Sequence, residues 1–491
     1  MLKSAHSSNR PLPDMTQSLL RALVASLHDD INLLDATSTQ LTADERLFQR
    51  VKKTALLVKL KSALSPVKEL PYEILSKIFS HCVTGTAKLP LQRSSAPWNL
   101  IQVCSKWRGV ALQVPNLWNN IAISFSSDRP QEFTHISKML HMFLAHAGIE
   151  PISLEILAEH IQSSPLGSVD PLCRSIEDIV RPYTSQLQHL SIRPPDQFQA
   201  LFSQSPHPLN LIQSVSLHTA KLAPDADLTT AGIIIPGGTP NLHKITISTD
   251  SATLDLRNLL FPWVRLTELR IMNTIVTYAG CHAALRQCRN LVSLVLGIVP
   301  GNNACLANLP DTRLRHLESL TVTASAEGDH GKFLLPFILP SLKAFSVTGG
   351  LNAKWVQLNI MIERSACSLE RFEALDFWSL DMHYFFLQVP SLTELSFRCS
   401  YSSYPLKRII PQISNLGLIP NLQILKCDLD GAEPVIELLE QRSQSAEATA
   451  IQSWVIYGDP EKAREMIGKS ALKLARGMEI IFQATDVPSA S

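Results

Sequence analysis

The stretch that decides the fold is Leu242-His243-Lys244-Ile245-Thr246-Ile247, because its spacing of apolar residues returns along most of the chain. One later copy reads Leu392-Thr393-Glu394-Leu395-Ser396-Phe397. Segments of this form begin at Leu187, Ile212, Leu242, Leu266, Leu291, Leu317, Leu342, Leu369, Leu392 and Leu422, at steps of 23 to 30 residues. So regular a period predicts one structural unit that is repeated along the chain.

Each copy predicts a short strand, with its fourth and sixth residues facing inward and its third, fifth and seventh facing outward. A strand this short cannot bury its apolar side alone, so neighbouring copies are expected to stack and share one core. The period and pattern resemble leucine-rich repeats, and this resemblance implies an irregular solenoid with the form of a horseshoe. The asparagine or cysteine position of that repeat family is mostly not matched here, which predicts irregular turns.

The composition is that of a folded protein with balanced charge. A chain of 491 residues is expected to form two or more units. Hydrophobic residues make up 45% and charged residues 18%, and a net charge of +1 gives no reason to expect nucleic acid or an anionic membrane as partner. No apolar run reaches the ~18 residues that a membrane helix needs.

The nine cysteines form no C-x-x-C pair and no even framework, which predicts reduced thiols in the cytoplasm, the nucleus or both. Cys281, His282 and Cys288 lack the second close pair that a zinc site needs, so we expect them in the core. The phosphate-loop, dinucleotide-binding, nucleophile-elbow and H-E-x-x-H motifs are all missing from the sequence. We therefore expect no catalytic residue, cofactor or metal, and no enzyme.

The N-terminal part predicts two helices. Leu20, Leu23, Leu27, Ile31 and Leu34 recur at three- and four-residue steps, which is typical of one apolar stripe on a helix. Thr42 and Glu45 match a capping box that begins a second helix. The apolar residues of this second helix are Leu47, Val51, Leu57, Val58, Leu60 and Leu64. The pair is expected to form a helical hairpin or a coiled-coil-like segment.

Between these helices and the repeats lie Leu70-Pro71-Tyr72-Glu73-Ile74-Leu75, Ile78-Phe79, Val103-Cys104-Ser105-Lys106-Trp107-Arg108 and Leu117-Trp118. The order and types of these residues resemble the F-box family, in particular the F-box-like proteins of filamentous fungi. This resemblance implies a three-helix module that docks on the Skp-type adaptor of cullin–RING ubiquitin ligases. The stretch from Phe79 to Val103 is longer than in compact F-boxes, which leaves the middle helix open. Carried over by position, the implied docking residues are Leu70, Pro71, Ile74, Leu75, Ile78, Phe79, Val103, Cys104 and Trp107.

Strand alternation also predicts which side chains the repeats present to a ligand. The charged members of this outward set are Lys244, Glu268, Arg270, Arg371, Glu373, Glu394, Arg398 and Lys426. Their mixed charge favours a protein or peptide ligand over a polyanion.

The leading functional hypothesis is therefore a substrate receptor of an SCF-type ubiquitin ligase, which binds an unknown protein through its leucine-rich repeats. The alternatives are an interaction scaffold that takes no part in ubiquitination and, third, an enzyme with an unrecognised site.

The expected class is α/β, with the helical segment and the three-helix F-box module preceding the solenoid. The expected organisation along the chain is a disordered N-terminus at 1–14, the helical segment at 15–64, the F-box-like domain at 65–120, the leucine-rich-repeat-like solenoid at 121–482 and a disordered C-terminus at 483–491.

Overall fold

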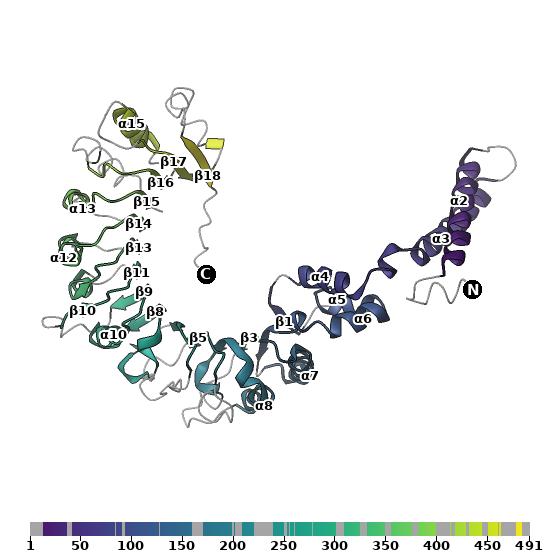
Figure 1. Cartoon of the computed structure of the whole chain (residues 1–491), viewed down its shortest axis with the longest axis horizontal. Helices are drawn as coiled ribbons and strands as arrows, with labels where there is room; N and C mark the ends of the chain where they lie inside the picture. The colour runs from purple at the N-terminus through teal and green to yellow at the C-terminus, as the bar shows by residue number, and fades with distance from the viewer. Residues whose placement is uncertain are drawn as a thin grey trace. The chain divides into compact units, whose positions relative to one another are not determined.

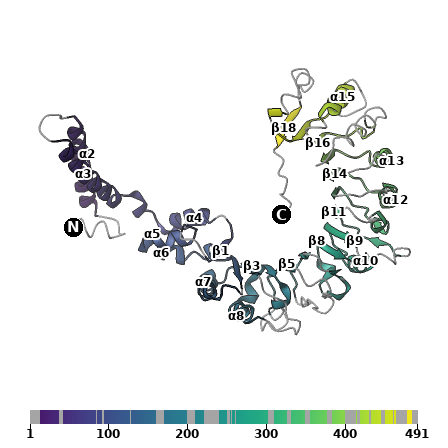
Figure 2. The same ribbon diagram turned by 180° about the vertical axis from the view of Figure 1, so that it is seen from behind.

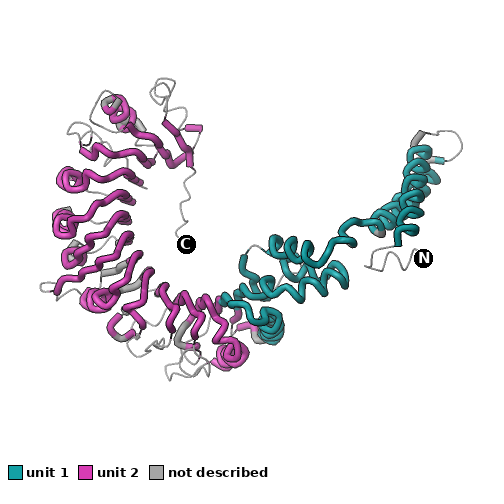
Figure 3. The backbone as a smooth tube through the Cα atoms, in the orientation of Figure 1, with its two compact units in different colours: residues 1–124, 131–154 teal, residues 125–130, 155–491 magenta. Residues whose placement is uncertain are grey.

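The protein is a mixed α/β chain with a large parallel sheet, as its repeats predict (Figure 1). The computed structural model describes residues 13–36, 42–83, 85–90, 94–126, 128–159, 170–198, 201, 209–219, 239–249, 253–254, 256–259, 261–276, 278–300, 309–324, 331–348, 355–375, 382–398, 413, 418–428, 432–443, 450–459, 461–462 and 478–483. Two compact units divide the chain, one of residues 1–124 and 131–154 and the other of residues 125–130 and 155–491 (Figure 3). We call them unit 1 and unit 2.

Unit 1 begins with a helical hairpin of α2 (Asp14–Ala36) and α3 (Ala43–Ala63). The predicted capping box is present, because the Thr42 side chain accepts from the Glu45 amide and Glu45 Oε2 accepts from the Thr42 amide at 3.0 Å. These hydrogen bonds to the backbone and side chain of Thr42 lower the pKa of Glu45. The hairpin seam holds Leu20, Leu27, Leu57 and Leu60. Leu23, predicted for the same stripe, is exposed, and Val24 packs against the seam in its place.

A helical module follows in unit 1. It comprises η1 (Pro66–Lys68), α4 (Tyr72–Cys82), β1 (Ala87–Leu89), α5 (Trp98–Val103), α6 (Ser105–Leu112) and η2 (Pro115–Leu117). Its core includes Leu75, Phe79 and the fully buried Trp118, whose indole N–H donates to the Ala111 carbonyl at 2.8 Å. The stretch between Phe79 and Val103 contains the short strand β1 and the helix α5.

Unit 1 also includes residues 121–124 and 131–154. Strand β2 (Asn120–Ser126) pairs in parallel with β1, followed by α7 (Pro130–Ala147) and β3 (Ile152–Glu159). The ring of Phe143 on α7 meets Trp118 edge-on, with ring centroids 4.8 Å apart. This aromatic contact packs α7 with the module.

Unit 2 is built around parallel strands that follow one another in chain order, and the first ten of them lie at the ten repeats (Figure 2). They are β4 (Leu187–Arg193), β5 (Ser214–Thr219), β6 (Lys244–Thr249), β8 (Glu268–Val276), β9 (Ser293–Pro300), β11 (Ser319–Ala324), β13 (Ala344–Thr348), β14 (Arg371–Leu375), β15 (Glu394–Arg398), β16 (Ile424–Asp428), β17 (Ser453–Tyr457) and β18 (Glu479–Gln483). Short strand β7 (Thr253–Leu254) pairs with β8, and β10 (Thr312–Arg313) pairs with β12 (Phe337–Ile338).

The repeated apolar residues form one continuous core in unit 2. In every repeat from Leu187 to Leu422 the first, fourth and sixth positions are buried, each exposed by 3% or less. The register aligns these positions from strand to strand, as in Ile245 beside Leu269 and Leu269 beside Leu294. Each strand therefore gains its buried neighbours from the repeats before and after it, as the stacking argument requires.

The turns before the strands carry a ladder of polar side chains. Asn241 Nδ2 donates to the Asn210 carbonyl at 2.6 Å, and Asn421 Nδ2 donates to the Pro390 carbonyl at 3.0 Å. Asn290 and Ser341 donate in the same way to the repeat before them. In all four cases the donor directly precedes the repeat's first apolar residue. The turns are thus more regular than the missing repeat asparagine predicts, because another position supplies the inter-repeat hydrogen bond.

In the part of unit 2 that the structure describes, the helices of the later repeats lie on one face of the sheet (Figure 1). They are α10 (Tyr278–Leu285), α11 (Gly331–Leu334), α12 (Trp355–Ser365), α13 (His383–Gln388) and α15 (Ala432–Ser443), with α8 (Pro171–Val180), η3 (Arg181–Gln186), η4 (Pro195–Phe198), η5 (Leu256–Asn258) and η6 (Trp263–Arg265) elsewhere in unit 2. No described helix covers the opposite face, which we call the open sheet face.

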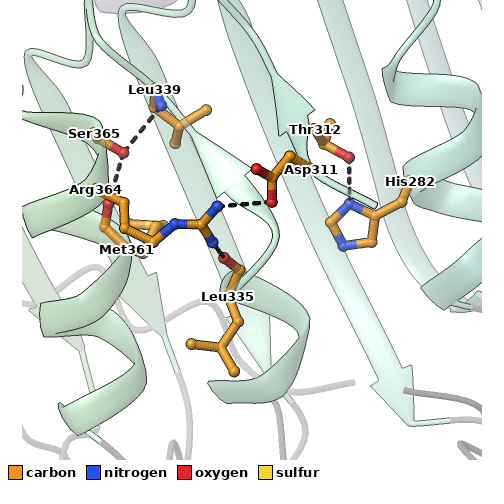
Figure 4. A network of polar contacts seen from close by, with 8 residues as sticks. All are labelled: His282, Asp311, Thr312, Leu335, Leu339, Met361, Arg364 and Ser365. Carbon is orange, nitrogen blue, oxygen red and sulfur yellow. Dashed lines mark hydrogen bonds and ion pairs between the residues drawn. The ribbon is translucent and has the colours of Figure 1, made fainter. Parts of the chain in front are cut away.

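Polar side chains join consecutive turns on the helical side (Figure 4). His282 is fully buried, with Nδ1 2.8 Å from the Thr312 hydroxyl and Nε2 3.0 Å from the Phe333 carbonyl. The guanidinium of Arg364 donates to Asp311 at 2.7 Å and to the Leu335 carbonyl at 2.6 Å. Cys281 and Cys288 are buried near this network, in the core where the sequence places them.

The predicted disordered ends fall almost wholly outside the described residues, at 1–12 and 484–491. Of the residues predicted to be disordered, Asp14 begins α2 and Gln483 ends β18.

Candidate interaction surfaces

An apolar patch lies on one side of α4, in the helical module of unit 1. We call it the α4 patch, and it consists of Pro71, Ile74 and Ile78, which share one side of the helix by their spacing. Pro71 is exposed, and the side chains of Ile74 and Ile78 are 44% and 40% exposed. Tyr72 and Val67 add exposed apolar surface nearby in the sequence, which motif-based reasoning missed. Large aliphatic side chains this open are candidates for contact with another protein.

Other predicted docking residues lie in the interior of the module. Leu75 and Phe79 are completely buried in the module, and their contact with a partner stays a prediction. Phe79 packs against Trp107, with ring centroids 4.9 Å apart. The physical reason is that α4 is apolar on both sides, and only one side meets α6. Trp107 is half-buried in this contact.

The remaining docking residues are fixed by polar contacts between the ends of the helices. Cys104 caps α6, and its Sγ accepts from the Trp107 amide at 3.4 Å. Lys106 Nζ donates to the Leu70 carbonyl at 2.9 Å and so ties the turn before α4 to α6. Val103, at the end of α5, is 58% exposed and is a second apolar candidate for contact.

The outward positions predicted on the repeats each stand next to a buried residue of their strand, and alternation therefore places them on the open sheet face of unit 2. The charged ones fall into two groups. The first lies on β6 and β8 and the second on β14, β15 and β16. Between them, β9, β11 and β13 present Ser293, Val295, Ser319, Thr321, Ala344 and Ser346. These short side chains allow another polypeptide to approach the strands closely.

The first charged group is a cross-strand ion pair with an arginine beside it. Lys244 Nζ lies 2.9 Å from Glu268 Oε2, and this hydrogen bond lowers the pKa of Glu268 against the opposing effect of burial. Arg270, two residues further along β8, is exposed. An ion pair with both partners about one-third exposed contributes little to stability, roughly 0–1 kcal/mol.

The second group is denser and more buried. Lys426 Nζ lies 2.7 Å from Glu394 Oε1. Burial opposes the charge on Lys426, but the hydrogen bond and charge of Glu394, together with the charges of Tyr457 and Glu373, outweigh burial and raise the pKa of Lys426. Glu373 accepts from the Ser346 hydroxyl at 2.9 Å, and Arg371 is exposed.

The same group contains a stacked cation and an unpartnered hydroxyl. The Arg398 guanidinium lies 4.3 Å from the centroid of the Tyr457 ring, and its Nε lies 4.0 Å from Asp428. Ser396 stands between Glu373 and Lys426 in register and is only 3% exposed, and its Oγ has no hydrogen-bond partner among the described residues. A buried hydroxyl without a partner is rare, and a ligand atom above β15 would satisfy it.

Sequence reasoning missed Asp428 and Tyr457. Tyr457 belongs to one further repeat, in which Ile451, Trp454 and Ile456 take the buried positions on and before β17. The signal was present, because Ile451 follows Leu422 by 29 residues, within the range of the other steps. Its Ile and Trp replace the leucines that define the pattern.

Among the described residues, no group of three or more His, Cys, Asp or Glu side chains could hold a metal ion. None of the described helices is both long and apolar enough to cross a membrane. Comparison with models of known protein families gives no match, and comparison with curated proteins gives none either.

Proposed function

We propose that this chain is a substrate receptor of the F-box type. Its helical module would dock on the Skp-type adaptor of an SCF-type cullin–RING ubiquitin ligase. The observation that carries this proposal is the α4 patch, where Ile74 and Ile78 stand exposed on a helix whose other side is buried. Apolar anchors on one side of a helix are a common means of docking into the groove of another protein.

The second half of the proposal concerns unit 2. One parallel strand per repeat, a shared core and helices gathered on one face support a leucine-rich-repeat solenoid with a horseshoe form. The open sheet face would hold the protein substrate. Its charged groups are of both signs and largely pair with one another, which favours a protein or peptide ligand over a polyanion.

In this role the chain performs no chemistry. It raises the effective concentration of a substrate lysine near the ubiquitin-loaded enzyme, and the other subunits carry out the transfer. The proposed partners are therefore the adaptor, the cullin–RING ligase beyond it and a substrate protein.

The adaptor test compares two substitutions on α4. Ile78→Asp places a charge in the patch, and Ser80→Asp places the same charge on an exposed site on another side of the helix. We expect the intact protein to bind the Skp-type adaptor at micromolar concentration. Ile78→Asp should weaken binding roughly thirtyfold, as for a buried interface anchor, while Ser80→Asp leaves it nearly unchanged. Equal effects of both substitutions, or no binding by the intact protein, would reject the proposal.

The ligase test asks what joins the complex after the adaptor. Co-purification of a cullin with the bound adaptor supports the receptor. A stable complex with the adaptor that excludes the cullin would instead assign the chain to the scaffold class, without a role in ubiquitination.

The substrate test uses the second charged group of the open sheet face. Proteins near the intact chain in its source cells are captured by proximity labelling and compared with those near the double variant Arg398→Glu, Lys426→Glu. We expect the variant to lose a subset of neighbours while it keeps the adaptor. An unchanged set of neighbours would show that the substrate does not bind at this part of the sheet.

A further inference from the structure

The helix α3 is apolar on the side that faces away from α2. Its residues Leu57 and Leu60 are buried in the seam of the hairpin. At about 100° per residue, Leu47, Val51 and Val58 stand nearly opposite that seam. Each of these three side chains is more than 60% exposed. The hairpin therefore buries one apolar side of α3 and, among the described residues, leaves a second one open.

This second apolar side is wide, and we call it the α3 stripe. It consists of Leu47, Phe48, Val51, Ala55 and Val58, and it spans roughly 100° of the helix surface. Phe48 is 67% exposed, although aromatic side chains are usually buried. Large apolar side chains that are gathered on one side of a helix, and that its own core does not use, mark a contact surface.

Cations flank the α3 stripe along both of its edges. Lys52 and Lys59 lie along one edge, and Arg50 and Lys61 lie along the other. All four residues are exposed. From Arg46 to Lys61 the helix carries six Lys and Arg residues and no Asp or Glu. The net charge of +1 of the whole chain therefore conceals a strongly basic helix.

Most of the negative charge of the hairpin lies away from the α3 stripe. The helix α2 carries four aspartates and one arginine, and it packs on the seam side of α3. There Asp30 pairs with Lys53 Nζ at 2.8 Å. The two acidic residues of α3, Asp44 and Glu45, stand in its first turn, before the stripe begins. A partner that meets the stripe therefore meets chiefly apolar and cationic side chains.

The spacing and the charge together exclude several partners for this surface. At heptad spacing from Leu47 and Val51, Thr54 and Lys61 occupy two of the positions at which a partner helix would need apolar residues. A second copy of α3 would bring two basic surfaces together, and their charges would repel each other. Nucleic acid would bind the cations but leave the apolar side chains in water.

An anionic membrane uses both parts of the surface. Aliphatic and aromatic side chains on one side of a helix enter the boundary between the lipid headgroups and the acyl chains. Lysine and arginine beside them keep their stems along the apolar layer and place their charges at the lipid phosphates. Such a helix lies in the plane of the membrane surface and does not cross the membrane.

We propose that the outward side of α3 binds an anionic lipid surface. The α3 stripe enters the interface, and Arg50, Lys52, Lys59 and Lys61 contact the headgroups. This inference is independent of the proposed function, because it uses neither the α4 patch nor the open sheet face.

The first test measures how much of the full chain floats with lipid vesicles in a density gradient. One set of vesicles consists of phosphatidylcholine alone, and the other of phosphatidylcholine and phosphatidylserine in equal parts. We expect the chain to bind the anionic vesicles, less so as salt is added, and to leave the neutral vesicles almost unoccupied. Binding to neither set, or equal binding to both, would overturn the proposal.

Two glutamate substitutions separate the contribution of the stripe from that of charge. Val51→Glu and Gln49→Glu each add one negative charge at an exposed site on α3, and only Val51 lies on the stripe. Val51→Glu should weaken binding to the anionic vesicles about tenfold more than Gln49→Glu, because it also removes an apolar side chain from the interface. Equal losses in the two variants would overturn the proposal. Circular dichroism checks that both variants keep their helices.

A second pair of variants tests the flanking cations. Lys52→Gln with Lys59→Gln removes two charges from one edge of the stripe, whereas Lys77→Gln with Lys138→Gln removes two from exposed sites of unit 1 outside the hairpin. The first variant should weaken binding roughly thirtyfold and the second less than about threefold. Similar losses would contradict the proposal. A full chain that is dimeric by light scattering and becomes monomeric with Val51→Glu would also overturn it, because the stripe would then belong to a second copy.

Discussion

The ring of Trp107 packs against Phe79 inside the helical module, with centroids 4.9 Å apart and planes inclined by 58°. The contact joins α4 to α6. It involves two residues that the motif assigns to docking, and both support the exposed side of α4 from within the module. Phe79 holds the buried side of α4, and this orients Ile74 and Ile78 outward. Stability and partner binding are therefore expected to depend on different residues of one short helix.

Replacing Phe79 by alanine should destabilise the module by ~3–5 kcal/mol, because a fully buried aromatic side chain leaves a cavity. Ile78→Ser, on the exposed side of the same helix, should change the free energy of unfolding by less than about 1 kcal/mol. Urea denaturation followed by tryptophan fluorescence measures both values, since Trp107 and Trp118 lie in the module. Similar losses in the two variants would contradict the assignment of Phe79 to the core and Ile78 to the surface.

The polar ladder of the turns should make a measurable contribution in each repeat. Asn421→Ala removes the donor to the Pro390 carbonyl and should cost about 1 kcal/mol. Gln452→Ala removes a side-chain amide at an exposed site before β17 and serves as the matched control. It should lower the free energy of unfolding by a few tenths of a kcal/mol at most. Chemical denaturation of the full chain compares them. A loss in Asn421→Ala no larger than in the control would show that the ladder is not energetically coupled to the fold.

Cysteine reactivity should separate the surface from the core. Burial raises the pKa of the Cys288 and Cys427 thiols to about 12 and raises that of Cys281 as well. Cys82 is exposed at the end of α4. Because the thiolate is the reactive form, iodoacetamide at neutral pH should label Cys82 in the folded protein and leave the three buried thiols unmodified until urea is added. Peptide mass spectrometry measures the order in which the cysteines are labelled. Labelling of Cys281 or Cys427 before urea is added would contradict the burial of these two side chains.

The repeats could be predicted from the sequence because burial is set there by a pattern that returns ten times. Every first, fourth and sixth position from Leu187 to Leu422 is buried, as alternation requires. The repeat that follows Leu422 was missed because Ile451 and Trp454 occupy the positions at which leucines define the pattern. The polar ladder was missed because its asparagines lie before the repeat, where a turn alone would account for them.

The helices of unit 1 were harder to predict in detail for one physical reason. A helix that is apolar on two sides does not tell which side is buried, and α4 and α3 are both of this kind. Leu75 and Phe79 therefore seemed to belong with Ile74 and Ile78, and Val51 with Leu57. Only the partner helix, α6 in one case and α2 in the other, decides between the two sides.

His282 should make the stability of unit 2 depend on pH. Burial lowers its pKa to about 4, against the opposing effect of the Phe333 carbonyl, from an ordinary value of 6.5. Between these values the unfolded chain binds the proton and the folded chain does not, so the free energy of unfolding falls as the pH falls from about 6.5 to 4. The contribution lost is on the order of 3 kcal/mol.

His282→Gln replaces the imidazole by a side-chain amide that can hydrogen-bond to the Thr312 hydroxyl and the Phe333 carbonyl but does not titrate. At pH 7 this variant should be less stable than the parent protein, because glutamine fits the aromatic surroundings of Phe333 and Phe337 less well than imidazole. As the pH falls toward 4 the difference should shrink, since only the parent loses the contribution of the neutral imidazole. Urea denaturation at a series of pH values measures both profiles, and parallel profiles would mean that His282 is protonated in the folded protein as readily as in the unfolded chain.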